Sequence, residues 1–427
     1  MVDGHISQRR VLVPLPTHHE ATVRMARVLA SEGVLAGLYV PMNTHRLDHA
    51  LGRVASPDGR ARRFLRRWNH GEQAHSAAVI PEVLTAAAFR LLAPFGHARL
   101  ASALAGWRSE QIDRGIARRL STQRPTTVLA LQGFNQRTQR ETRRLGIGTW
   151  LNVNADCWGM GEVVRDLAAQ SRTGGELRDL DTEDWGRNVP AVERQIREAE
   201  WIFTESNRMA GRVRAIAPPE TPIVSLGQGV DAAFFAPRLD RASGEKLRVV
   251  QVSRVAYAKG IEVANAAAER ASPWIEHFDV AGWNVSRQAM LRKNSTHLRF
   301  LGGLPATGVR DLLQQADAFV LPTLADSMPR AVIEAMAAGL PAITTDCSGY
   351  QDLIEDGVNG FIVPAGDAGA IAARLRLLSQ DPGLRLRMGR AARATAERNT
   401  WEHYEERFRT ALREFLAARP AKAPTSD

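Results

Sequence analysis

The feature that most constrains the fold is an alternation of short apolar runs with helical patterns, and it occurs twice along the chain. In the first half the strand-like runs are residues 10–15, 38–40, 128–131, 150–153 and 201–204. After Pro237 the alternation restarts, with runs at 247–252, 277–281, 298–301, 318–321, 342–345 and 361–363. Alternating strands and helices predict a parallel sheet covered on both faces. The sequence therefore predicts an α/β protein with two such sheets.

Length agrees with two domains, because 427 residues exceed the ~100–200 residues of an ordinary domain. A polar, charged stretch at 239–246 separates the two sets of strands, and residues 401–415 have helical periodicity. We expect a first domain over 1–238 and a second over 239–400. A final helix over 401–418 and a frayed tail over 419–427 follow.

Composition narrows the class of protein. No apolar run approaches the ~20 residues that span a bilayer, and the N-terminus lacks the pattern of a secretory signal, so a cytoplasmic protein is expected. Cys157 and Cys347 fit no metal-ligand or redox spacing and read as buried or idle thiols. The formal charge of +10 attracts phosphates, anionic lipid and nucleic acid alike. It predicts an anionic ligand without identifying it.

The sharpest local signal is the stretch AFVLPTLADSMPRAVIEAMAAGLP at 318–341. A buried strand ends at Pro322, Ser327 is a good N-cap, and Pro329 suits the first helical turn. Open amides at such a helix start, beyond the carboxyl end of a parallel strand, favour an anion such as a diphosphate. The residues at this expected helix start are Ser327, Met328, Pro329 and Arg330.

Glu334 lies one turn into this helix. Helical side chains lean toward the N-terminus, so its carboxylate is expected to reach back and accept hydrogen bonds from ribose hydroxyls. The alternative is a simple surface pair with Arg330, one turn earlier.

Arg254 and Lys259, in VSRVAYAKG, follow another strand of the same sheet. Two cations at the carboxyl end of a strand are placed to clamp a diphosphate and to stabilise charge on a leaving group. The alternative is two exposed surface cations.

Taken together, these segments resemble the C-terminal domain of the family 4 retaining glycosyltransferases. The resemblance runs from about Glu205 to Tyr404, through TESNRMAGRV, GQGVDAAFFAP, SRVAYAKG, ADSMPRAVIEAMAAGLPAITT, SGYQDLIEDGVNGFIVP and Trp401. It implies the GT-B fold, in which two Rossmann-like domains face each other and the last helix crosses back to the first domain.

The resemblance also implies an activity, transfer of a sugar from a nucleoside-diphosphate sugar to an acceptor hydroxyl with retention of configuration. A hexosyltransferase is expected, with no cofactor and no metal. Arg254 and Lys259 become diphosphate ligands, Glu334 holds the ribose and Asp326 the transferred sugar. Asp326 departs from the family, which has a glutamate there, and its carboxylate is one methylene shorter. The acceptor is a sugar, a lipid-linked molecule or a small molecule.

The first domain matches the family less well. The family's Gly-Gly after the first strand is absent, and His18 and His19 occupy this loop, while Asn154 replaces a histidine at the end of a middle strand. These three residues are the candidates for the acceptor cleft. His18 or His19 is either a general base or a structural, acceptor-contacting residue.

Two further features have competing interpretations. Asp179 and Asp181 form an Asp-x-Asp without a preceding strand, which favours solvated surface over a metal site. The basic stretch Arg60–Trp68 is either a solvated face or a peripheral contact with the inner face of a membrane. No nucleic-acid-binding module is present, so nucleic acid is not an expected partner.

Two rival functions remain open at this stage. One is a nucleotide-sugar epimerase or phosphorylase of the same fold. The other is a non-catalytic homologue that binds sugar nucleotides, which Asp326 and the altered first loop suggest.

Overall fold

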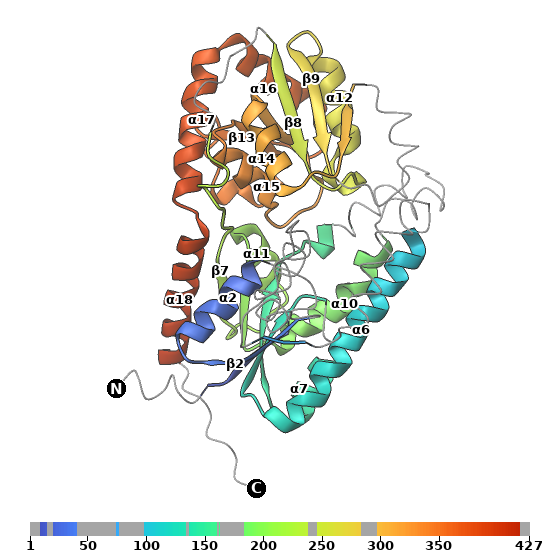
Figure 1. Ribbon diagram of the computed structural model, residues 1–427, viewed down its shortest axis with the longest axis vertical. Coiled ribbons are helices and arrows are strands. Elements are labelled where there is room, and N and C mark those ends of the chain that lie inside the picture. The colour runs from blue at the N-terminus through green and yellow to red at the C-terminus, as the bar shows by residue number, and fades with distance from the viewer. Residues whose placement is uncertain are drawn as a thin grey trace, which may run out of the picture.

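The computed structural model describes residues 9–14, 20–40, 74–76, 98–133, 136–159, 162, 183–237, 246–282 and 297–418. Within them the chain forms two α/β domains, one above the other in Figure 1, each built on one parallel sheet. The predicted α/β class with two Rossmann-like domains is confirmed.

The first sheet has the strand order β3-β2-β1-β4-β5-β6-β7, and all its pairings are parallel. Its strands are β1 Val11–Pro14, β2 Leu35–Val40, β3 Ala74–Ser76, β4 Thr127–Leu131, β5 Gly148–Val153, β6 Trp201–Thr204 and β7 Ile223–Ser225. The helices of this half are α2 Glu20–Ser31, α6 Ala98–Gln123, α7 Gln136–Arg144, α10 Glu183–Glu198 and α11 Asn207–Arg214.

The second sheet has the order β10-β9-β8-β11-β12-β13, again parallel throughout. Its strands are β8 Leu247–Val252, β9 Ile275–Ala281, β10 Arg299–Gly302, β11 Ala318–Leu321, β12 Ala342–Thr345 and β13 Gly360–Val363. Its helices are α12 Ile261–Ala271, α14 Ala306–Gln315, α15 Arg330–Ala337, α16 Ala368–Gln380 and α17 Pro382–Glu397.

In both sheets the order of the strands reverses at a single point. The order runs outward from β1 toward β3 on one side and from β4 onward on the other; β8 and β11 repeat this arrangement in the second sheet. Open α/β sheets bind ligands beyond the carboxyl ends of the strands at this switch point. The fold therefore marks one candidate edge in each domain.

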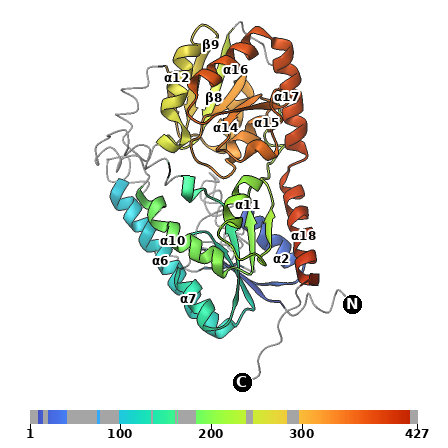
Figure 2. The same ribbon diagram turned by 180° about the vertical axis from the view of Figure 1, so that it is seen from behind.

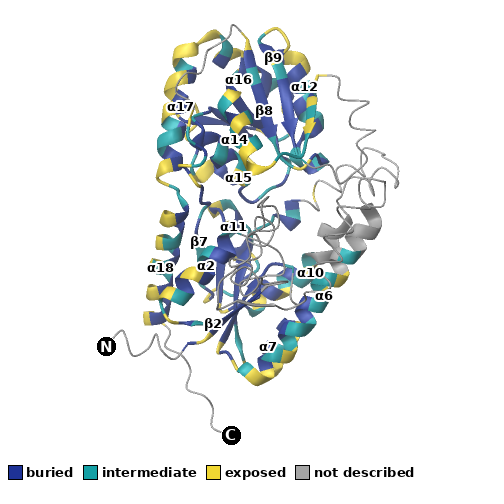
Figure 3. Cartoon of the chain, in the orientation of Figure 1, coloured by how far each residue is buried: buried dark blue, intermediate teal, exposed yellow. Residues whose placement is uncertain are grey.

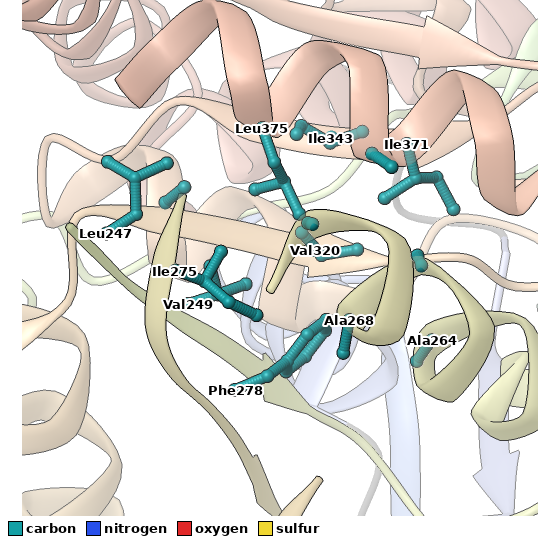
Figure 4. Packing of buried hydrophobic residues seen from close by; sticks show 14 of the residues in the cluster. Leu247, Val249, Ala264, Ala268, Ile275, Phe278, Val320, Ile343, Ile371 and Leu375 are labelled. Carbon is teal, nitrogen blue, oxygen red and sulfur yellow. The ribbon is translucent and has the colours of Figure 1, made fainter. Parts of the chain in front are cut away.

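The second domain's core lies on both faces of its sheet, as near-continuous apolar strands require. Figure 4 shows one face, where Val249, Phe278 and Val320 pack against Ala268 of α12 and Ile371 of α16. The opposite face buries Val250, Phe319 and Leu321 against α14, α15 and α17. Figure 3 shows these strands as mostly buried, with exposed residues on the outer sides of the helices and in the loops.

The last helix, α18 Trp401–Ala418, belongs to the core of the first domain. Phe415 stacks on Trp201 of β6 with ring centroids 4.3 Å apart and planes 4° apart. In Figures 1 and 2 α18 runs alongside α2, and buried residues of both helices share one cluster with β1, β5 and β6. The predicted crossover helix is therefore confirmed.

A glycine permits the crossover. A Cβ on Gly229 would lie 2.3 Å from the Trp401 ring, so no larger residue fits. The amide of Val230 also donates to Asn399 O at 3.1 Å, and the Trp401 amide to Val230 O at 3.3 Å.

Every predicted strand is present with small changes of boundary, and β3 and β7 are additional strands that were not predicted. The predicted boundary at 238/239 and the tail over 419–427 lie outside the described residues, as do His18, His19, Arg60–Trp68, Asp179 and Asp181. In the described part of the chain, no helix is both long and apolar enough to cross a membrane.

Candidate donor site between the two domains

Two loops meet at the switch point of the second sheet. One leaves β8 and spans 253–260, and the other leaves β11 and spans 322–329. The Leu324 amide donates to Ala258 O at 2.8 Å, and the Thr323 hydroxyl donates to the same oxygen at 2.9 Å. These bonds fix the two loops against each other.

The close approach requires a glycine at 260. Gly260 has φ +71°, and a Cβ there would lie 1.8 Å from Pro322 O. An L-residue is strained at this φ and has no space for its side chain. In the Lys-Gly pair of the sequence, Lys259 is therefore the candidate ligand for an anion, and Gly260 permits the close backbone contact with Pro322.

Lys259 and Asp326, predicted for different parts of the donor, form an ion pair with each other across these loops. Their side chains are only 20% and 14% exposed, so the pair is partly shielded from water. Asp326 Oδ1 also accepts from the Ser327 amide at 3.2 Å. The structure thus unites two of the predicted site residues.

Arg254, by contrast, lies at the exposed beginning of the 253–260 loop. The structure places it at the same edge of the sheet as Lys259, because both follow β8. Its contact with a diphosphate remains a prediction.

Glu334 lies on α15 and is partly buried. Burial raises the pKa of its carboxyl, and the charge of Arg330 acts in the opposite direction. No ion pair joins Arg330 and Glu334 in the described part of the chain, so the simple surface pair considered from the sequence is not formed. The ribose contact remains a prediction.

The predicted N-cap is wrong. α15 begins at Arg330 with Pro329 at its N-cap position, and no side chain caps it. The Ile333 amide, in the first turn of α15, instead donates to the Tyr350 hydroxyl at 3.2 Å. Ser327 lies too early in the chain to cap α15, and its side chain points to the first domain.

Ser327 joins the two domains. Its hydroxyl lies 2.9 Å from Asn154 O and 2.6 Å from Glu205 Oε2, both at the ends of strands of the first sheet. Gln228 Nε2 donates to Met328 O at 3.0 Å. The carboxyl edges of the two sheets therefore face each other across the loop 326–329.

Asn154 is positioned by its own domain. Gln132, which follows β4, accepts from the amides of Asn154 and Ala155 at 3.1 and 2.9 Å and donates to Ala155 O at 2.9 Å. The backbone carbonyl of Asn154 thus faces the second domain, where it accepts from the Ser327 hydroxyl. Its role toward an acceptor remains untested.

A further carboxyl was missed from the sequence. Glu205 follows β6 and is 7% exposed. Burial, assisted by the charge of nearby Asp326, raises its pKa to about 8, while Ser327, Arg330 and Gln228 act in the opposite direction. A charged residue directly after the fully buried strand WIFT was the available signal.

The described residues contain no group of three or more His, Cys, Asp or Glu side chains suited to hold a metal ion. Asp179 and Asp181 lie outside them, so the absence of a metal remains a prediction. Of the two cysteines, Cys157 is buried and Cys347 partly exposed, and both are free thiols. Burial raises the pKa of Cys157 to about 12, which agrees with an unreactive thiol.

Comparison with known proteins agrees with this geometry. Residues 238–395 match the family described as glycosyl transferases group 1. The putative colanic acid biosynthesis glycosyltransferase WcaL of Salmonella typhimurium is 29% identical over 205 residues, 45% of this chain and 50% of that protein. A glycogen synthase of Mycobacterium tuberculosis is 31% identical over 219 residues, 48% of this chain and 52% of that protein. The chain matches about half the length of these relatives.

Solved structures share the whole architecture. Sucrose-phosphate synthase from Thermosynechococcus elongatus aligns with a TM-score of 0.63 at 15% identity, over 96% of this chain and all of that one. HepE of Anabaena, solved with UDP-glucose, aligns with a TM-score of 0.62 at 12% identity, over 95% of this chain and 99% of that one. Such low identity supports the fold alone, and the fold is GT-B. The segment 238–395, which carries Lys259, Asp326 and Glu334, is the part of the chain that matches the model of the glycosyl transferases group 1 family.

Proposed function

We propose that this protein transfers a sugar from a nucleoside-diphosphate sugar to an acceptor hydroxyl. The observation that carries the proposal is the Lys259–Asp326 pair, which joins β8 and β11 at the switch point of a domain that matches a glycosyltransferase family. Ligands of open α/β sheets bind at that edge.

The pair has a defined task in donor binding. An anionic diphosphate attracts the Lys259 ammonium away from Asp326, and the freed carboxylate accepts hydrogen bonds from hydroxyls of the sugar. Arg254 adds a second cation, and Glu334 accepts from the ribose. The resting ion pair therefore keeps both groups in place until a donor replaces it.

We further propose retention of anomeric configuration, in a hexosyltransferase without metal or cofactor. A double displacement requires a carboxylate nucleophile beneath the anomeric carbon. Asp326 is assigned to the hydroxyls instead, and it is paired with Lys259. In same-face substitution the departing diphosphate, stabilised by Lys259 and Arg254, itself takes the proton of the acceptor hydroxyl.

The acceptor is assigned to the first domain, across the cleft from Lys259. His18 and His19 come after β1 in the sequence, and we assign them to the acceptor. A sugar, a lipid-linked molecule and a small molecule remain the classes of acceptor, and Arg60–Trp68 remains the proposed membrane contact. Among the proteins of similar fold, HepE was solved with UDP-glucose, and we choose this sugar nucleotide as the first donor to test.

The test combines donor screening with stereochemistry. Thermal shifts are measured with a panel of sugar nucleotides, since a ligand at 100 times its dissociation constant adds ~2.7 kcal/mol. Proton NMR of the first-formed glycoside then gives its configuration. A product of retained configuration that forms only with an acceptor supports the proposal.

The rivals give different products. An epimerase converts the donor without any acceptor, and a phosphorylase requires phosphate. A non-catalytic homologue binds the donor but neither transfers nor hydrolyses it. An inverted glycoside, with turnover abolished in His18→Ala or His19→Ala, would move the proton-accepting group to the first domain.

A further inference from the structure

Glu205 is a buried carboxyl of the first domain in direct contact with the donor loop of the second. Its Oε2 lies 2.6 Å from Ser327 Oγ, and the same hydroxyl lies 2.9 Å from Asn154 O. Ser327 immediately follows Asp326, the proposed sugar ligand. Glu205 has no part in the mechanism proposed above.

The two contacts of Ser327 compete for one proton. A serine hydroxyl has one O–H to donate, and the Asn154 carbonyl only accepts. An ionised Glu205 also only accepts, so Ser327 then satisfies one of its two neighbours. A neutral Glu205 donates to Ser327 Oγ, and Ser327 donates to Asn154 O. Only the neutral acid completes both hydrogen bonds.

The remaining contacts fix the backbone of this loop. Ser206 donates to Ser327 O at 3.2 Å, Gln228 to Met328 O at 3.0 Å, and Tyr350 to Pro329 O at 2.8 Å. Three successive carbonyl groups are thus held. The Ser327 hydroxyl adds a side-chain contact between this loop and a titratable group of the first domain.

The charges around Glu205 come from both domains. Burial is the main cause that raises the pKa of Glu205 to about 8; the charge of Asp326 acts in the same direction, whereas Arg330 lowers it. Tyr350 and Tyr404 also face Glu205, and burial raises the pKa of each hydroxyl, so both remain neutral. Near neutral pH the buried carboxyl is therefore protonated.

We propose that Glu205 is a positioning residue whose neutral carboxylic acid, donating to Ser327, holds the donor loop 326–329 against the first domain. The proposal rests on the proposed function, because it treats this loop as part of the donor site. Glu205 touches neither donor nor reacting atoms. It acts through Ser327 on the neighbouring Asp326.

The direction in which pH changes the joining of the two domains follows from the pKa of Glu205 in the joined and in the separated arrangement. In the joined arrangement the pKa of Glu205 is about 8, and we expect separation from the second domain to expose the carboxyl and lower its pKa toward the ordinary value of 4.5. Joining therefore takes up a proton between these values. The equilibrium for joining falls by up to tenfold for each pH unit in this window and levels off above it.

The first test is the pH dependence of UDP-glucose affinity in wild type and Glu205→Gln, measured by calorimetry from pH 6 to 9. Glutamine donates to Ser327 at every pH, so we expect weaker binding with rising pH in wild type and a flatter profile in the variant. Ser327→Ala should remove the same dependence. Glu200→Gln is the matched control, because Glu200 is exposed at the opposite end of β6 and should keep the wild-type profile.

The second test needs no donor. Carbon-13 NMR of labelled glutamate should show one carboxyl that titrates near pH 8 and disappears in Glu205→Gln. An ordinary titration of Glu205, or an identical affinity profile in wild type and Glu205→Gln, overturns the proposal. If UDP-glucose does not bind but the NMR signal titrates near pH 8 and shifts in Ser327→Ala, the positioning contact stands and the proposed donor is wrong.

Discussion

The two domains share one strand order but differ at the point where that order reverses. In the second, β8 and β11 lead to Lys259 and Asp326, which form an ion pair. In the first, β4 leads to Gln132, a neutral residue whose amide group holds the backbone of the next loop. Among the residues that the structure describes, the loops after β8 and β11 present charge at the switch point, whereas Gln132 after β4 fixes the shape of the chain. This difference suggests that donor chemistry belongs to the second domain and acceptor placement to the first.

The domains also differ in how their cores are completed. The second domain forms its core from residues 246–397 with a few residues from 230–235. The first takes Phe408, Leu412 and Phe415 from the other end of the chain. Its stability should therefore depend on a helix that follows the whole second domain.

The largest expected effect is on the stability of the first domain when its contact with α18 is weakened. Phe415→Ala removes the ring stacked on Trp201, and loss of a buried phenylalanine costs ~3–5 kcal/mol. In urea unfolding followed by fluorescence and by far-ultraviolet circular dichroism, the first domain should unfold at lower denaturant than in wild type. Leu386→Ala is the control, because Leu386 is 55% exposed on α17. Equal destabilisation of both domains would show that their cores are not separate.

The second prediction concerns the charged edge. Lys259→Ala removes a cation proposed to meet charge on the leaving group, and loss of such a contact costs ~2.7–4 kcal/mol, about 100- to 1,000-fold in kcat. Arg254→Ala should act in the same direction. The control is Lys246→Ala, because Lys246 is exposed at the opposite end of β8. Near-normal turnover in both Lys259→Ala and Arg254→Ala would show that these residues do not stabilise the leaving group.

The third prediction concerns the neutral edge. Gln132→Ala leaves the partly buried amides of Asn154 and Ala155 without their acceptor, and since an unsatisfied buried group costs ~1–3 kcal/mol, we expect a cost toward the lower end of that range. We expect a higher KM for acceptor with donor hydrolysis largely retained. Gln136→Ala is the control, because Gln136 is exposed at the start of α7. Loss of donor hydrolysis in Gln132→Ala would contradict the division of roles between the domains.

The charged edge was predictable because its signals are local. A buried strand, a proline and an acidic residue at 319–326, together with Lys-Gly after another strand, place Lys259 and Asp326 at one edge of a parallel sheet. That the two residues pair with each other was not predictable, because the sequence gives no distance between loops that follow different strands. The two loops approach closely because Gly260 has no side chain to collide with Pro322 O, and this contact is visible only in the structure.

The Ser327 prediction failed for a related reason. A serine two residues before a proline has the local pattern of an N-cap, and only tertiary contacts show that its hydroxyl is engaged by Glu205 and Asn154. Those residues are 122 and 173 positions earlier in the chain. β7 was missed because its three residues are only partly buried and carry a weak apolar pattern.

The smallest expected effect is that of chelation, which should leave turnover unchanged. A metal in such a reaction neutralises the diphosphate as it departs, and on our proposal Lys259 and Arg254 supply that charge. Asp326 is a poor candidate for a metal ligand because it pairs with Lys259. Activity measured in EDTA, with Lys259→Ala in parallel, separates the two sources of charge. Loss of activity in EDTA that manganese or magnesium restores would return attention to Asp179 and Asp181. If Asp179→Ala and Asp181→Ala then lost the metal response, the positive charge that neutralises the diphosphate would be held by the first half of the chain. The proposed division between a charged and a neutral domain would then fail.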